Sequence, residues 1–111
     1  MKEKEILLKG TPASPGEVRG KVKIVMEPEH TDKMEDKEIL VTPFTNPLFI
    51  PAILKASAII TDEGGMMCHA AIVAREFGIP CVTGTEQATK KLTDEMEVIV
   101  DGERGFIYGQ K

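Results

Sequence analysis

His69 stands between a pair of glycines and a predicted helix, and it is the residue best placed to do chemistry. Gly64 and Gly65 end an apolar, strand-like stretch, and glycine permits backbone conformations that other residues resist. Helical spacing of apolar residues predicts a helix over residues 70–77, and Gly78 supplies a stop signal. The predicted apolar stripe consists of Ala70, Val73, Ala74 and Phe77. We therefore expect the imidazole at a helix N-terminus, where backbone N–H groups and the helix dipole favour an anion. This position indicates a nucleophile that takes up a phosphoryl group.

The neighbours of His69 are poor choices if stability alone is considered. Two consecutive glycines lose the most backbone entropy on folding, and Met66 and Met67 place apolar side chains in a turn, where polar residues are usual. Local choices that cost stability are expected at functional sites. His30, by contrast, lies in a polar stretch and is interpreted as a surface residue.

Two other uses of the region stay open at this point. Cys68, His69 and Cys81 are possible zinc ligands, but two adjacent ligands and a third twelve residues away match none of the usual spacings. Cys68 is also a possible nucleophile with His69 as its base, although adjacent helical side chains point about 100° apart. Cys81 is most simply a small core residue. We expect no metal site.

Length and composition predict one domain over residues 1–111. The 41% hydrophobic content suffices for a core, and the net charge of −4 with scattered basic residues argues against a nucleic-acid partner. No apolar run reaches the ~20 residues of a membrane span, and the charged N-terminus does not resemble a signal peptide. We expect a cytoplasmic protein with two reduced thiols and no membrane partner.

The remaining elements must position the histidine turn. Strands are predicted over residues 6–8, 18–26, 39–42, 57–61, 81–83, 96–100 and 105–108, and helices over residues 46–55, 70–77 and 85–91. Residues 10–16 are predicted to be a turn-rich loop, and residues 27–38 a surface connection. Asp101-Gly102 predicts a hairpin between the last two strands. Local strand pairs followed by alternating strands and helices predict an α/β domain with mixed sheets rather than a doubly wound one.

Residues 64–76, with the sequence GGMMCHAAIVARE, resemble the phosphohistidine signature of the phosphoenolpyruvate-utilising enzymes. That family includes phosphoenolpyruvate synthase, pyruvate phosphate dikinase and enzyme I of the sugar phosphotransferase system. The resemblance continues through residues 78–85. Residues 13–20, 39–47 and 98–108 also look like family segments, so that nearly the whole chain is covered.

The resemblance implies a mobile, or swivelling, domain with a three-layer β/β/α fold. It implies that His69 is the phosphoacceptor, through Nε2, and that the domain carries the phosphoryl group between two remote active sites. The residues expected to form the turn around the phosphate are Gly64, Gly65, Met67, Cys68 and Ala70.

Two positions depart from the family pattern. Met67 stands where better-known members have a threonine that can hydrogen-bond the phosphate and, in the synthase and dikinase, is a regulatory phosphorylation site. Methionine can do neither, so we expect phosphate binding to depend more on backbone N–H groups. Asp94-Glu95 replaces a common Asp-Gly turn, a change that we interpret as structural.

The chain contains neither a nucleotide-binding domain nor a barrel for phosphoenolpyruvate, so it is not a complete enzyme by itself. We expect a stand-alone carrier that works with separately encoded nucleotide-binding and phosphoenolpyruvate- or pyruvate-binding partners. The chain itself is expected to bind no cofactor, whereas the partners need Mg²⁺ and ATP or phosphoenolpyruvate. The alternative is a non-catalytic regulatory or docking module that retains the fold. The oligomeric state is left open.

Overall fold

The computed structural model describes residues 4–110; residues 1–3 and 111, which the single-domain prediction includes, lie outside the described residues. The strands are β1 (Lys4–Lys9), β2 (Thr11–Ser14), β3 (Glu17–Ile24), β4 (Ile39–Thr42), β5 (Ala58–Thr61), β6 (Cys81–Thr83), β7 (Glu97–Asp101) and β8 (Phe106–Gln110). The helices are α1 (Ile50–Ile53), α2 (His69–Phe77) and α3 (Ala88–Lys91), with 3-10 turns η1 (Pro28–Lys33) and η2 (Pro47–Phe49). No helix within residues 4–110 is long and apolar enough to cross a membrane.

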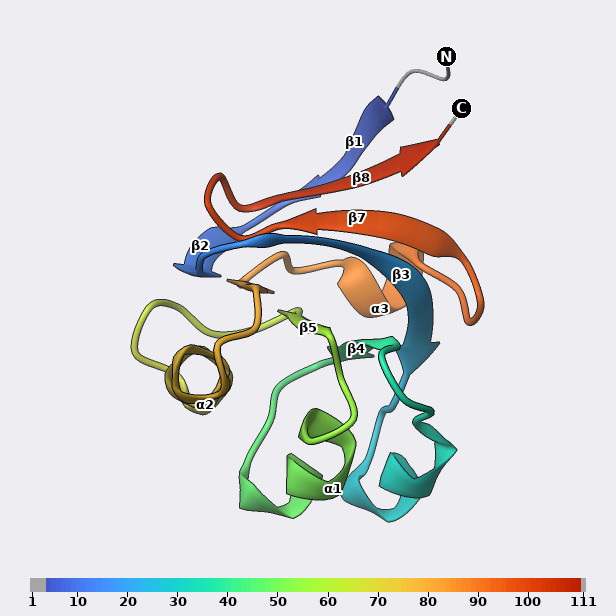
Figure 1. The fold of residues 1–111 in the computed structure, drawn as a ribbon, viewed down its shortest axis with the longest axis vertical. Helices are drawn as coiled ribbons and strands as arrows, with labels where there is room; N and C mark the ends of the chain where they lie inside the picture. Colours follow the sequence, from blue (N-terminus) through green and yellow to red (C-terminus); the bar gives the residue numbers. More distant parts are fainter. Residues whose placement is uncertain (1–3, 111) are drawn as a thin grey trace.

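The strands form one mixed sheet in the order β1-β8-β7-β3-β4-β5-β6-β2. Strands β3 to β6 in this order run parallel, whereas β1, β8, β7 and β2 pair antiparallel with their neighbours. The sheet folds over itself, so that the antiparallel half covers one face of the parallel strands while α1 and α2 lie on the other (Figure 1). This is the mixed α/β, three-layer architecture predicted from the sequence.

The parallel strands β4, β5 and β6 are buried on both faces. In β4, Ile39 and Val41 join the core between the two sheet layers, whereas Leu40 joins the core beneath the helices. Strands β5 and β6 repeat this alternation. Burial on both faces explains why these strands appear in the sequence as short continuous apolar runs.

Helix α2 packs against the sheet through small residues in its first two turns: Ala70, Ala71, Val73 and Ala74 are all buried. It ends at Gly78, which takes the left-handed conformation with φ 71°. The apolar stripe predicted for this helix was wrong at one position. Phe77 lies in the last turn and is 44% exposed, and Ala71 is buried instead.

The predicted loop over residues 10–16 was wrong, because it contains β2. This strand pairs with β6 at the end of the sheet, with a register shift between Pro12 and Ser14. Proline is tolerated in such an edge strand because one side of it needs no ladder hydrogen bond. The turn-forming residues of this segment are the reason why the sequence predicted a loop instead of a strand.

The segment after β3 also differs from the prediction. Strand β3 ends at Ile24 rather than at residue 26, and after it Val25 is buried while Met26 is 52% exposed. The backbone N–H of Val25 donates to Val41 at 2.9 Å, which turns its side chain toward the helix layer. The surface connection over residues 27–38 contains η1 and the buried Met34, so it contributes to the core.

The helix predicted over residues 46–55 begins at the expected cap, since Asn46 Oδ1 accepts a hydrogen bond from the Leu48 N–H at 2.9 Å. It consists of the 3-10 turn η2 followed by the short α1. The helix predicted over residues 85–91 starts only at Ala88. The interpretation of Asp94-Glu95 as structural agrees with their contacts. Asp94 accepts from the Ile24 N–H, and Glu95, at φ 73°, pairs with Lys23.

The loop between β5 and α2 contains one glycine that its conformation requires. Gly64 has φ 110°, and a Cβ there would lie 2.7 Å from Cys68 Sγ. A Cβ at Gly65 would meet no atom within 4 Å. We expected both glycines to be needed for conformations that other residues resist. The structure shows this need for Gly64 alone.

This difference predicts opposite results for two alanine substitutions. Gly64→Ala should lower the free energy of unfolding by about 1–3 kcal/mol, because alanine is strained at this φ and collides with Cys68. Gly65→Ala should leave it unchanged or raise it by up to about 1 kcal/mol, since alanine restricts the unfolded chain. Denaturant unfolding of both variants measures the effect. Equal losses in the two variants would contradict this account of the loop.

Candidate functional site

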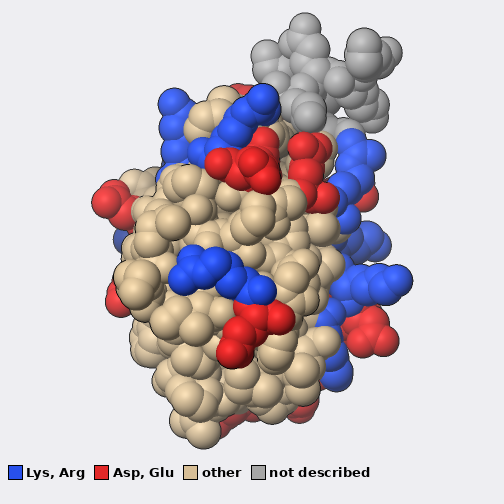
Figure 2. All heavy atoms as spheres, turned by 60° about the vertical axis from the view of Figure 1, so that its left-hand side comes forward, with Lys and Arg blue, Asp and Glu red and all other residues tan. Residues whose placement is uncertain are grey.

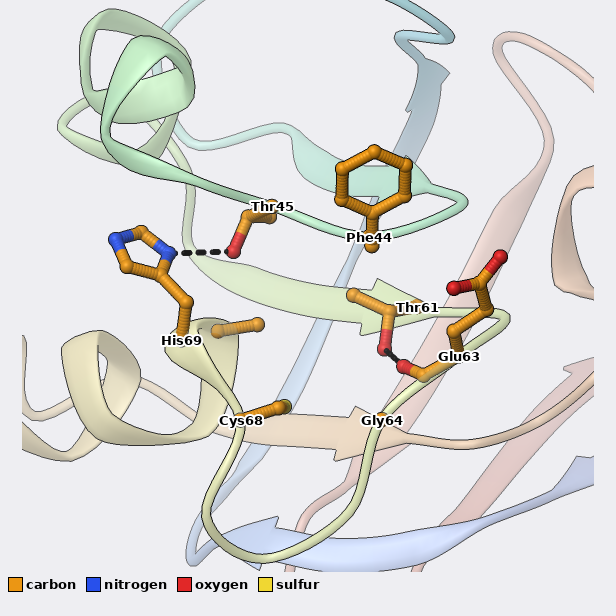
Figure 3. Close-up of a pocket in the computed structure, with 8 residues that line it drawn as sticks. Phe44, Thr45, Thr61, Glu63, Gly64, Cys68 and His69 are labelled. Carbon is orange, nitrogen blue, oxygen red and sulfur yellow. Dashed lines mark hydrogen bonds between the residues drawn. The ribbon is translucent and has the colours of Figure 1, made fainter.

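The carboxyl ends of β4 and β5 and the N-terminus of α2 meet at one edge of the parallel strands (Figure 3). They enclose a pocket of about 210 Å³. Its lining residues are Phe44, Thr45, Thr61, Glu63, Gly64, Cys68, His69 and Ala70. Carboxyl ends of parallel strands are a usual place for ligands, because the connecting loops diverge there.

Each of the parallel strands β4, β5 and β6 ends in a threonine that is completely buried: Thr42, Thr61 and Thr83, respectively. Their hydroxyls donate to the backbone carbonyls of Phe44, Glu63 and Gly65, at 3.1, 2.6 and 3.1 Å, respectively. These hydrogen bonds satisfy buried hydroxyls and tie the loops to the ends of the sheet. The loops that line the pocket are thus held by the strands below them.

The imidazole of His69 is oriented by Thr45. The distance between His69 Nδ1 and Thr45 Oγ1 is 2.8 Å, and Thr45 is buried. The other ring nitrogen, Nε2, points away from Thr45 (Figure 3) and has no hydrogen-bond partner among the described residues. When Nδ1 carries the proton and donates to Thr45, the free lone pair is on Nε2. That tautomer is the one able to attack phosphorus through Nε2.

Helix α2 offers backbone donors beside the ring. No side chain caps its N-terminus, and the Ile72 N–H donates to Cys68 at 3.1 Å. The N–H groups of His69, Ala70 and Ala71 precede that hydrogen bond in the first turn, where helices leave donors unpaired. These donors and the helix dipole stabilise an anion at this end by roughly 0.3–1 kcal/mol.

The side chains around the pocket supply no cation. Glu63 is the one acidic residue among the described residues of the lining, which contains neither Lys nor Arg. Arg75, on α2, donates to Ala13 O at 2.7 Å and to Met66 O at 2.9 Å. Its guanidinium therefore holds the loop before His69 against β2.

The structure brings together some of the residues that we expected around a phosphate. Gly64, Cys68, His69 and Ala70 line the pocket, whereas Gly65 and Met67 do not. The Met67 side chain is 79% exposed. The role of this set in phosphate binding stays a prediction.

Sequence reasoning missed the pocket residues that come from the two strand ends, Thr45 above all. The available signal was that Thr45 follows a buried strand and precedes the Asn46-Pro47 helix start. This places it at the carboxyl edge of the sheet. Its pairing with His69 has no local signature.

The two competing readings of this region gain no support from the geometry. Within residues 4–110, no group of three or more His, Cys, Asp or Glu side chains could hold a metal ion. Burial raises the pKa of the Cys81 thiol to about 12, so Cys81 stays protonated and inert. Because Thr45 contacts His69 Nδ1, that nitrogen is not available as a base for Cys68.

Comparison with known proteins agrees with this description. Residues 34–105 match the family described as PEP-utilising enzyme, mobile domain. A probable phosphoenolpyruvate synthase of Archaeoglobus fulgidus is 56% identical over 96% of this chain, and the phosphoenolpyruvate synthase of Pyrococcus furiosus is 53% identical over 97%. The chain spans only 14% and 13% of the lengths of these two proteins.

Two solved structures resemble the fold. An enzyme I structure superposes on 69% of this chain and 32% of its own with a TM-score of 0.60 and 28% identity. Thermococcus kodakaraensis aconitase X superposes over 98% of both chains with a TM-score of 0.67, but at 22% identity it supports the fold alone. The match over residues 34–105 and the identity with the two synthases show that the chain belongs to the family of mobile domains of phosphoenolpyruvate-utilising enzymes.

Proposed function

We propose that this chain carries a phosphoryl group on Nε2 of His69 between an active site that binds phosphoenolpyruvate or pyruvate and one that binds a nucleotide or a carrier protein. The observation that carries the proposal is the 2.8 Å contact of Nδ1 with Thr45, which leaves Nε2 without a partner beside the N-terminus of α2. Family membership supports the same chemistry.

The acceptance step uses the Nε2 lone pair of a neutral imidazole. Nε2 attacks the phosphorus of phosphoenolpyruvate, a P–N bond forms, and the P–O bond to the enol carbon breaks. The electron pair leaves with the oxygen as the enolate of pyruvate, which then takes up a proton. The phosphorylated ring is an imidazolium whose Nδ1–H donates to Thr45. In the donation step an acceptor oxygen attacks the phosphorus and the P–N bond breaks.

The chain's own contribution is to hold and orient the nucleophile. Thr45 holds the ring through Nδ1, and in this proposal the first N–H groups of α2 face the phosphoryl oxygens. Metal-bound nucleotide and phosphoenolpyruvate belong to the partner sites, which we propose lie on separately encoded proteins that need Mg²⁺ and ATP or phosphoenolpyruvate. A cytoplasmic location is part of the same proposal.

A second candidate function is a non-catalytic docking module. The exposed Met67 favours it, because methionine offers no hydroxyl to a phosphate where better-known family members have threonine. Phosphorylation of His69 distinguishes the two functions directly.

We predict that His69 is labelled from radioactive phosphoenolpyruvate by Pyrococcus furiosus phosphoenolpyruvate synthase whose corresponding histidine has been changed to alanine. The label should be lost in acid and kept in base, as expected of a phosphoramidate. His69→Ala should abolish it, and His30→Ala, at an exposed site, should keep it. A wild-type chain that stays unlabelled would favour the docking module, and label that persists in His69→Ala would show that another residue is the acceptor.

We predict that Thr45→Val lowers the rate of phosphorylation of His69 about 10–100-fold, since a hydrogen bond to a charged ring contributes roughly 1.5–3 kcal/mol. Thr45→Ser retains the oxygen and should restore most of the rate. Rapid-quench measurement of label on each variant checks this, with circular dichroism to confirm folding. If the valine and serine variants are equally fast, the Thr45 hydroxyl does not position the ring for phosphorylation.

A further inference from the structure

The loop that leads from β5 into α2 has several backbone carbonyl groups bound by side chains from other parts of the domain. Threonine hydroxyls at the ends of β5 and β6 donate to Glu63 O and Gly65 O, at 2.6 and 3.1 Å, respectively. The next carbonyl along the chain, that of Met66, accepts a hydrogen bond from Arg75 Nη2 at 2.9 Å. Side-chain donors therefore decide in which direction these carbonyl oxygens point.

Arg75 differs from the two threonines because it bridges two segments and carries a charge. Its Nη1 donates to Ala13 O of β2 at 2.7 Å, and Ala13 is buried in the same core cluster as the first turns of α2. The planar fork of a guanidinium suits two carbonyl acceptors at once. The side of the molecule that carries α2 is largely uncharged, with a small group of blue and red atoms near its centre (Figure 2). The charge of Arg75 is thus used on two backbone carbonyls.

The hydrogen bond to Met66 O also fixes the direction of the Met67 N–H. In a planar trans peptide the C=O and N–H groups point in opposite directions. Because Met66 O points toward the Arg75 guanidinium, the Met67 N–H points away from it. This N–H has no hydrogen-bond partner among residues 4–110. It lies two residues before His69, beside the first N–H groups of α2.

We propose that Arg75 is a positioning residue for phosphoryl transfer, which holds the Met66–Met67 peptide so that its N–H, and not its carbonyl, faces a phosphoryl group on His69. This inference rests on the proposed carrier function. A released peptide can rotate and bring a carbonyl oxygen, with its partial negative charge, toward the phosphoryl oxygens. The methionine at position 67 offers no hydroxyl, so its backbone N–H is the donor that this position supplies.

The proposal separates the bridge made by Arg75 from its charge. Nη1 and Nη2 are each engaged by a backbone carbonyl, so Arg75 acts through the peptide rather than on the phosphoryl group itself. Lysine would keep the positive charge but lacks the planar fork that binds two acceptors. If the bridge is what matters, lysine cannot replace arginine here.

The test measures phosphorylation of His69 by phosphoramidate, a small donor that needs no partner protein. Ammonia is present as well, so that the phosphorylated fraction, read by phosphorus NMR, reflects an equilibrium. The variants are Arg75→Lys and Arg75→Met, and Arg19→Met is the matched control, because Arg19 is an exposed arginine on β3 in the other sheet layer. All are made in a His30→Ala background, which leaves His69 as the one histidine of the chain. Amide proton NMR reports the Met67 N–H.

We expect both Arg75 variants to lower the equilibrium constant for phosphorylation about three- to tenfold and Arg19→Met to change it less than about twofold. A hydrogen bond from the backbone to a charged, partly solvated group has an effect of this order. In the protein that keeps Arg75, phosphorylation should move the Met67 amide proton downfield by more than any amide proton of the second sheet layer. The same shift should be much smaller in Arg75→Met.

The other outcomes would overturn the positioning role. If Arg75 only stabilises the fold, its variants will unfold at lower denaturant concentration but keep the full equilibrium constant. A full equilibrium constant in Arg75→Lys would show that the charge alone suffices. A Met67 amide proton that does not move in the protein with Arg75 would refute the proposal even if neither variant folds. These results leave the carrier function standing, whereas a protein with Arg75 and His69 that is never phosphorylated would overturn both.

Discussion

Burial of β4, β5 and β6 on both faces is the constraint on which the rest of the structure depends. The second sheet layer covers one face and α1 and α2 cover the other, so these strands can present functional groups only at their ends. Each strand closes with a buried threonine whose hydroxyl binds a loop carbonyl. The loops around the pocket are thereby attached to the buried strands, and this attachment helps to fix the position of His69.

The site combines an oriented nucleophile with few other chemical groups. Thr45 orients the ring, the start of α2 offers backbone donors, and the pocket lining lacks a cationic side chain among the described residues. Such a site is suited to holding a phosphoryl group rather than to activating a donor or a leaving group.

Local signals predicted the elements that surround His69. Strands β4, β5 and β6 are continuous apolar runs, and α2 has both helical spacing and a glycine stop, so each is recognisable within a few residues. Strand β2 was missed because Pro12 and its turn-forming neighbours are compatible with a strand only at a sheet edge. Met34 was missed because one buried side chain in a polar segment leaves no periodic pattern.

The sequence by itself determined that a histidine begins a helix after a glycine turn, since caps, stops and periodicity act over roughly one or two helical turns. The tertiary structure decided which nitrogen of that histidine is free. Thr45 lies 24 residues from His69, and the two meet because β4 and β5 are neighbours in parallel register. It also decided that Gly64 is required and Gly65 is not, because a Cβ at Gly64 would meet Cys68 of the loop and Thr83 of β6, whereas a Cβ at Gly65 would meet no atom within 4 Å. Contacts of this kind depend on how distant segments pack, which no local pattern encodes.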